Sequence, residues 1–123
     1  MKIKNNTDLV QSYVMTTAKY EFSAYEKRVL YRIVEVLQAK TNKLKLKYNY
    51  STQDDLFGAT EFTLPVSCFL KNENDTNYDE VKKALISLRQ KGFEYEDSKH
   101  WGFYGIIEMP KIKKYDMFVQ FTV

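Results

Sequence analysis

Two groups of cationic side chains have the types and spacing that suit contacts with nucleic-acid phosphates. The first lies in the segment "NYDEVKKALISLRQKGFEYED" and the second in "PKIKK". Lysine and arginine neutralise phosphates, and glutamine can also bind the edge of a base. We therefore predict a DNA-binding surface that comprises Lys82, Lys83, Arg89, Gln90, Lys91, Lys111, Lys113 and Lys114.

The first group has few residues that could read a base sequence. Only Gln90 and Arg89 suit base edges, whereas Asp79 and Glu80 stand at the helix start and would repel phosphate. Contacts with the DNA backbone are predicted, and a solvated helix face is an equally good interpretation. On composition alone, the "PKIKK" lysines at a hairpin tip indicate a solubilising turn more often than a phosphate contact. Lys43, Lys45 and Lys47 are interpreted as protection of an edge strand.

The residue inventory excludes the common catalytic sites. One histidine, His100, and one cysteine, Cys68, cannot supply an ordinary zinc site. The four glycines do not form a phosphate-cradling loop. We therefore expect a protein that is not an enzyme and that needs no metal or other cofactor. Trp101 is predicted to fill the core.

Length and composition favour one domain across residues 1–123, with a net charge of only +3. The chain contains no run of about 18 apolar residues that could span a membrane. Its first residues make a poor signal peptide, and a single cysteine cannot form an intramolecular disulfide. These features predict a cytoplasmic protein that does not bind membranes.

The periodicity of apolar residues predicts helices packed on a small antiparallel sheet. Ser23 and Glu26 form a capping box at the start of one helix, and Asn77 and Glu80 resemble another. Gly92 is placed as the left-handed residue that ends the later helix. The expected elements are helices at 5–17, 23–38 and 77–91, a short helix opened by Pro65, strands at 43–50, "TEFTLP", "FEYE", "WGFYGII" and "YDMFVQFTV", and a loop at "EMPKIKK". This order predicts an α+β winged helix with a C-terminal β-hairpin wing.

The helix at 23–38 has an apolar face wider than one core usually requires. Either the domain wraps this helix or a second chain covers it. Ile86, on the outer face of the later helix, also suits a protein contact. The residues predicted to form a homodimer are Tyr25, Val29, Val36 and Ile86.

Several stretches together resemble the plasmid replication initiators that bind repeated origin sequences, or iterons. They are "LVQSYVMTTAKYEFSAYEKRVLYRIVEVL", "FTLPVSCFL", "NYDEVKKALISLRQKGFEYED" and "WGFYGIIEMPKIKKYDMFVQFTV". The resemblance implies the first of two tandem winged-helix domains of a bacterial initiator, which dimerises and contacts the DNA backbone. It also implies engagement of host replication proteins. A second domain, the main base reader, is expected after Val123; a short relative that lacks it is the alternative.

Two other functions fit the same sequence. A winged-helix transcriptional regulator would bind its operator through the helix at 77–91. A protein-interaction module would have no DNA role, which the modest net charge permits.

Overall fold

The computed structural model describes residues 19–56, 58–96 and 98–123, so the helix expected at 5–17 lies outside the described residues. The described elements are α2 (Ala24–Thr41), β1 (Ser51–Asp54), β2 (Thr60–Pro65), the 3-10 helix η1 (Val66–Phe69), α3 (Tyr78–Gln90), β3 (Gly92–Glu96), β4 (Trp101–Gly105), β5 (Glu108–Lys113) and β6 (Phe118–Thr122).

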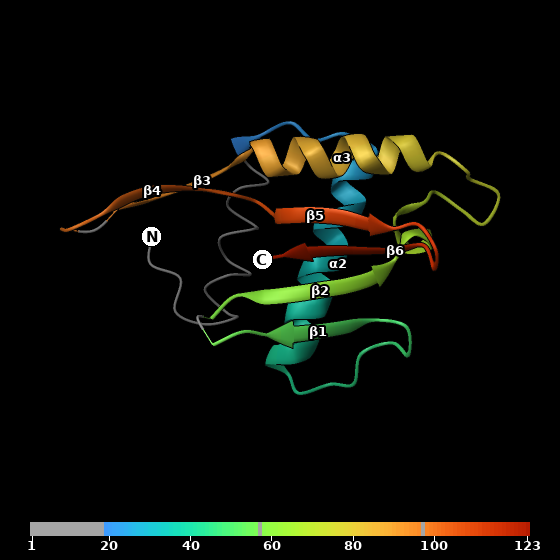
Figure 1. Cartoon of the computed structure of the whole chain (residues 1–123), viewed down its shortest axis with the longest axis horizontal. Coiled ribbons are helices and arrows are strands. Elements are labelled where there is room, and N and C mark those ends of the chain that lie inside the picture. The colour runs from blue at the N-terminus through green and yellow to red at the C-terminus, as the bar shows by residue number, and fades with distance from the viewer. Residues whose placement is uncertain (1–18, 57, 97) are drawn as a thin grey trace.

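The domain is built on a four-stranded antiparallel sheet with the strand order β1-β2-β6-β5. Helix α2 crosses one face of this sheet, and α3 lies alongside the edge that β5 forms (Figure 1). Strands β3 and β4 pair only with each other and project from the end of α3 as a two-stranded arm (Figure 1). The predicted α+β winged-helix class is confirmed.

The core lies between α2 and the inner face of the sheet. Phe62 of β2 stacks on its cross-strand partner Phe121 of β6, with 5.3 Å between ring centroids. Val29 and Val36 of α2 are buried in the same cluster. The wide apolar face of α2 is therefore covered by the domain itself, because the sheet, η1 and α3 all pack around this helix. Neither valine has exposed surface for a second chain, which corrects their predicted role in the homodimer.

The capping box at the start of α2 is confirmed. Ser23 Oγ accepts the Glu26 N–H at 3.2 Å, and Glu26 Oε1 accepts the Ser23 N–H at 3.0 Å. The second carboxylate oxygen of Glu26 accepts the Ser87 hydroxyl at 3.0 Å and the Lys91 ammonium at 2.8 Å. One buried carboxylate thus ties the beginning of α2 to the end of α3.

The ends of α3 differ from the prediction. Asn77 precedes the helix but its side chain makes no capping hydrogen bond. Gly92 is not in the left-handed region but begins β3 in extended conformation. A Cβ atom at Gly92 would stand 2.0 Å from the carbonyl oxygen of Tyr104, so glycine is required here by the close approach of β4.

Two strand assignments also need correction. Residues 43–50 form no strand: Lys43 has a φ of 56° directly after α2, and Tyr48 is 97% exposed in a turn. This stretch serves as the connection from α2 back to the sheet edge, where β1 begins at Ser51. Conversely, most of the loop expected at "EMPKIKK" is β5. Pro110 is accommodated in this strand by a bulge and by the φ of 51° at Met109.

We expect the Glu26→Gln substitution to lower the free energy of unfolding by about 2 kcal/mol, because it weakens a buried charge-assisted network. Urea denaturation followed by circular dichroism measures this. Glu80→Gln is the control, since the Glu80–Lys83 pair is exposed and contributes at most about 0.5 kcal/mol. An equal effect of both substitutions would contradict the role of the network.

The same carboxylate predicts a pH dependence. Burial disfavours the charged form of Glu26, but the hydrogen bonds from Lys91, the Ser23 backbone and Ser87 outweigh it and hold the pKa below 4.5. Because the folded-state pKa is below the unfolded one, this stabilisation is present above pH 4.5 and is lost as the pH falls through the folded-state pKa. In acid, therefore, the stability of the wild-type protein should fall more than that of Glu26→Gln.

Candidate nucleic-acid interface

The outer face of α3 carries half of the residues predicted to contact DNA. Lys82, Lys83, Arg89 and Gln90 are exposed there, and Ile86 between them is 55% exposed. Helical spacing alone would put Ser87 on this face beside Lys83 and Ile86, but its hydroxyl donates a hydrogen bond to Glu26 instead. The exposed side of α3 is therefore narrower than its sequence indicates.

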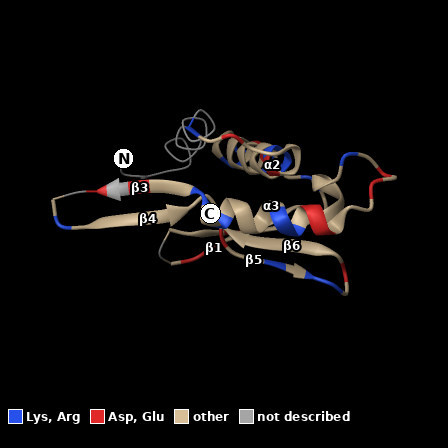
Figure 2. Cartoon of the chain, turned by 90° about the horizontal axis from the view of Figure 1, so that it is seen from above, with Lys and Arg blue, Asp and Glu red and all other residues tan. Residues whose placement is uncertain are grey.

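The lysines of "PKIKK" extend this surface along the sheet. Lys111 and Lys113 are exposed on β5, and Lys114 follows in the turn to β6. Figure 2 shows the cationic segments of α3 and β5 next to each other, and the Arg89–Glu108 ion pair joins the two elements. The structure brings these residues together, but Lys111 and Lys113 stand on a strand rather than at the predicted hairpin tip.

The cations of the α3 face each have a carboxylate partner. Lys82 lies 3.7 Å from Asp79 and Lys83 lies 3.3 Å from Glu80, both as exposed pairs one helical turn apart. Such pairs contribute little and open readily, so a phosphate can compete for the lysine. Arg89 is held at 2.8 Å by Glu108. The face can contact phosphates, but it is weakly cationic and presents few groups for base reading.

Lys91 belongs to the fold rather than to this face. Its ammonium contacts Glu26 at 2.8 Å, donates to the Glu21 carbonyl at 3.2 Å and lies 4.9 Å from the centre of the Phe22 ring. A DNA contact by Lys91 would require breaking the network that joins α2 and α3. We therefore remove it from the predicted surface.

The β3–β4 arm presents aromatic surface that the sequence analysis did not anticipate. Trp101 is 62% exposed, Phe103 48% and Tyr104 50%. The prediction that Trp101 fills the core is wrong, because the arm projects beyond the sheet and no core forms around it (Figure 1). Tyr104 and Phe93 face each other at 6.5 Å between ring centroids. The sequence contained one signal that Trp101 is not in the core. The strand "WGFYG" contains two glycines, and glycine is uncommon inside a buried strand.

The remaining residues predicted for dimerisation are only partly accessible. Tyr25 is half-buried, and its hydroxyl donates to Asp75 at 2.7 Å. Ile86 alone of the four predicted residues has an exposed side chain on the domain surface. Among the described residues, the largest group of neighbouring exposed aromatic side chains is on the arm, which makes the arm a better candidate for a protein contact.

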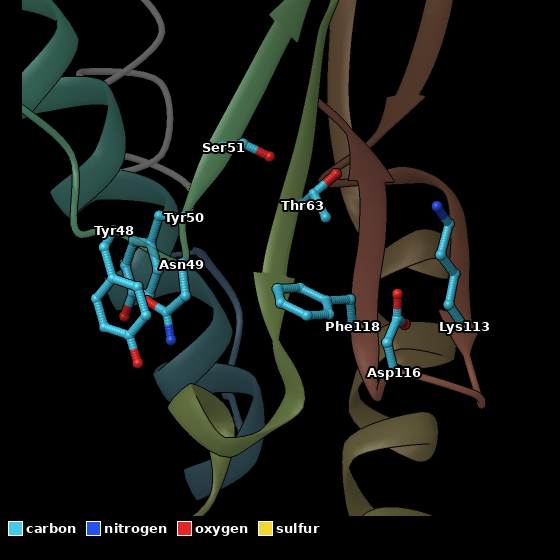
Figure 3. Close-up of a pocket in the computed structure, with 8 residues that line it drawn as sticks. All are labelled: Tyr48, Asn49, Tyr50, Ser51, Thr63, Lys113, Asp116 and Phe118. Carbon is cyan, nitrogen blue, oxygen red and sulfur yellow. The ribbon is translucent and has the colours of Figure 1, made fainter.

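No catalytic arrangement emerges at the end of the sheet where the structure is hollowed. A pocket of about 320 Å³ lies here. Figure 3 shows Tyr48 on one side of it and Lys113 and Asp116 on the other. Nearby, burial raises the pKa of Tyr50 to about 12 and that of the Cys68 thiol to about 11. Both groups are therefore neutral near pH 7, and neither is an activated nucleophile.

Within the described residues, no helix combines the length and apolarity needed to cross a bilayer. The same part of the chain holds no group of three or more His, Cys, Asp or Glu side chains arranged to bind a metal ion.

Comparison with known proteins identifies the chain through one family. The family described as "Initiator Replication protein, WH1" matches residues 8–123. No curated protein and no solved structure matches the chain significantly. The match covers nearly the whole sequence and includes α3, the arm and the lysine-bearing strand β5. The chain therefore belongs to the initiator replication protein family and carries its WH1 domain, a winged helix of plasmid replication initiators.

Proposed function

We propose that this chain binds origin-repeat DNA through the α3–β5 surface and forms a homodimer through the β3–β4 arm. It acts without catalysis or a cofactor, in the cytoplasm of a plasmid-bearing bacterium. It works with host replication proteins. The membership in the initiator family is the observation that carries this proposal.

The geometry of α3 and β5 supports backbone contact rather than base reading. Lys82, Lys83, Lys111 and Lys113 are exposed on neighbouring elements, where they can reach phosphates along one duplex. The acidic first turn of α3 disfavours deep entry into a groove. This acidic turn also weighs against a transcriptional regulator, which would need α3 as its own reader.

The arm supports dimerisation because it exposes apolar surface and its edges are unpaired with the main sheet. A two-stranded hairpin is marginal by itself, so further pairing or packing would stabilise it. Burial of Trp101 and Phe103 against a second copy would remove large aromatic surfaces from water. Glu94 and Glu96 on the same arm would repel DNA, which favours a protein partner here.

The DNA surface predicts a specific change in salt dependence. We expect Lys82→Gln/Lys83→Gln and Lys111→Gln/Lys113→Gln each to weaken binding to origin-repeat and scrambled duplexes alike. Each lost phosphate contact should reduce the slope of log affinity against log salt concentration by about 1. Fluorescence anisotropy with labelled duplexes over a salt series measures both effects.

Lys43→Gln/Lys45→Gln is the matched control, because it removes the same charge from a distant loop. Arg89→Ala and Gln90→Ala test the regulator hypothesis, which requires them to change the sequence preference. DNA affinity that is independent of salt, or an equal loss in the control, would count against the α3–β5 surface.

The arm predicts a fluorescence change on association. Trp101 is the single tryptophan of the chain, so its emission should shift to shorter wavelength as dimers form with rising protein concentration. Phe103→Ser should raise the dimer dissociation constant by about tenfold or more, because it removes a large apolar contact. Analytical ultracentrifugation gives the constant independently of the fluorescence.

Tyr115→Ser is the control for the arm, since Tyr115 is fully exposed in the β5–β6 turn. It should leave both measurements unchanged. A strictly monomeric protein, or a dimer that Phe103→Ser leaves intact, would exclude the arm as the dimer contact.

A further inference from the structure

A pocket between α2 and η1 gathers cations that the proposed DNA surface does not use. It has a volume of about 310 Å³, at the lower end of the range for small-ligand sites. The residues that line it are Lys27, Arg28, Tyr31, Arg32, Cys68, Leu70 and Lys71. Four of them are cationic, and no Asp or Glu is found among the described residues that form its walls.

Arg28 provides the strongest sign that this pocket accepts an anion. Its Nη1 atom is buried, yet none of the described residues accepts a hydrogen bond from it. The guanidinium is held at 4.6 Å from the centre of the Tyr25 ring, which fixes its position without satisfying its N–H groups. A buried donor without a partner is costly. Arg28 also lines the pocket, and a small rotation of its guanidinium would bring this donor to an anion bound there.

The neighbouring carboxylates offset only part of the positive charge of the pocket. Hydrogen bonds from Lys71, Tyr25 and Asn77, together with the charge of the nearby Arg28, lower the pKa of the Asp75 carboxyl. Glu35 is occupied by Arg32, with 2.8 Å between Oε2 and Nη1. Asp75 accepts the backbone N–H groups of Lys71 and Asn77, at 2.8 and 2.9 Å, together with the Tyr25 hydroxyl. In the described part of the chain, no carboxylate pairs with the exposed ammonium groups of Lys27 or Lys71. These two lysines therefore remain available to a ligand.

The shape of the pocket rim indicates the kind of anion. Tyr31 is 64% exposed beside the cations, and the Arg32 guanidinium lies 5.4 Å from the centre of its ring. An exposed aromatic ring next to a phosphate-sized cationic site suits a nucleotide, whose base can stack while its phosphate is bound. Figure 2 shows α2 and β5 on opposite sides of α3, so DNA on the α3–β5 surface would not fill this pocket.

We propose that the α2–η1 pocket binds the phosphate group of a nucleotide through Arg28, Lys27 and Lys71. The group comes from a small phosphate ester or from a second DNA strand, and the chemistry of recognition is the same. This site goes beyond the α3–β5 DNA surface and does not depend on it.

The arginine side-chain signals of the chain provide a direct test by nuclear magnetic resonance. Arg28, Arg32 and Arg89 are its three arginines, so three Nε–H signals report separately on the pocket and on the α3–β5 surface. Addition of inorganic pyrophosphate should shift the Arg28 signal saturably and leave that of Arg89 unchanged. A short duplex that also shifts Arg28 would identify DNA as the source, whereas a response to pyrophosphate alone would identify a small ester.

Affinity measurements with variants complete the test. Lys27→Gln/Lys71→Gln, which changes only exposed side chains, should weaken pyrophosphate binding by about tenfold or more. Lys43→Gln/Lys45→Gln should leave it unchanged. The proposal is overturned if neither pyrophosphate nor duplex moves the Arg28 signal, if chloride at equal ionic strength moves it equally, or if both variants bind alike.

Discussion

The buried carboxylate of Glu26 is the interaction on which the arrangement of the functional surfaces depends. It accepts hydrogen bonds from the start of α2 and from the Ser87 hydroxyl and Lys91 ammonium at the end of α3. These bonds fix which side of α3 faces the solvent. They also fix where the arm begins, because Gly92 follows Lys91 directly and its carbonyl accepts the Tyr20 hydroxyl at 2.8 Å. One ionised group therefore orients both the candidate DNA surface and the arm.

This use of charge inside the fold explains why the α3 surface is only weakly cationic. Lys91, which looks like a DNA contact in the sequence, is needed to balance Glu26. Arg89 is similarly joined to Glu108 of β5, where the ion pair links the helix to the sheet edge. The cations left for phosphates lie mostly on β5 and in exposed pairs on α3. Such a surface supports affinity that is sensitive to salt and nearly independent of sequence.

The sequence predicted elements whose signals are local and missed those that depend on distant partners. The capping box of Ser23 and Glu26 could be identified because both residues belong to one helical turn. The alternation in residues 43–50 was misleading, since a strand also needs a neighbour and the sheet edge begins only at Ser51. Trp101 was placed in the core because periodicity cannot distinguish a strand within the sheet from one in a projecting arm. The Lys91–Glu26 pair spans 65 residues of chain, beyond any local pattern.

Among the described residues, the largest group of exposed aromatic side chains lies on the arm, so the proposed association would use the arm rather than the apolar face of α2. The wide apolar face of α2 is buried in the domain's own core. Val29 and Val36 therefore cannot also contact a second chain. The arm has no such cover and lies next to the end of α3 (Figure 1), so a dimer formed through it would place the second copy beside the candidate DNA surface. Glu94 and Glu96 are exposed on the arm and would disfavour DNA there, whereas the lysines of β5 would attract it. Charge thus separates the two surfaces even though a single residue, Lys91, connects their elements.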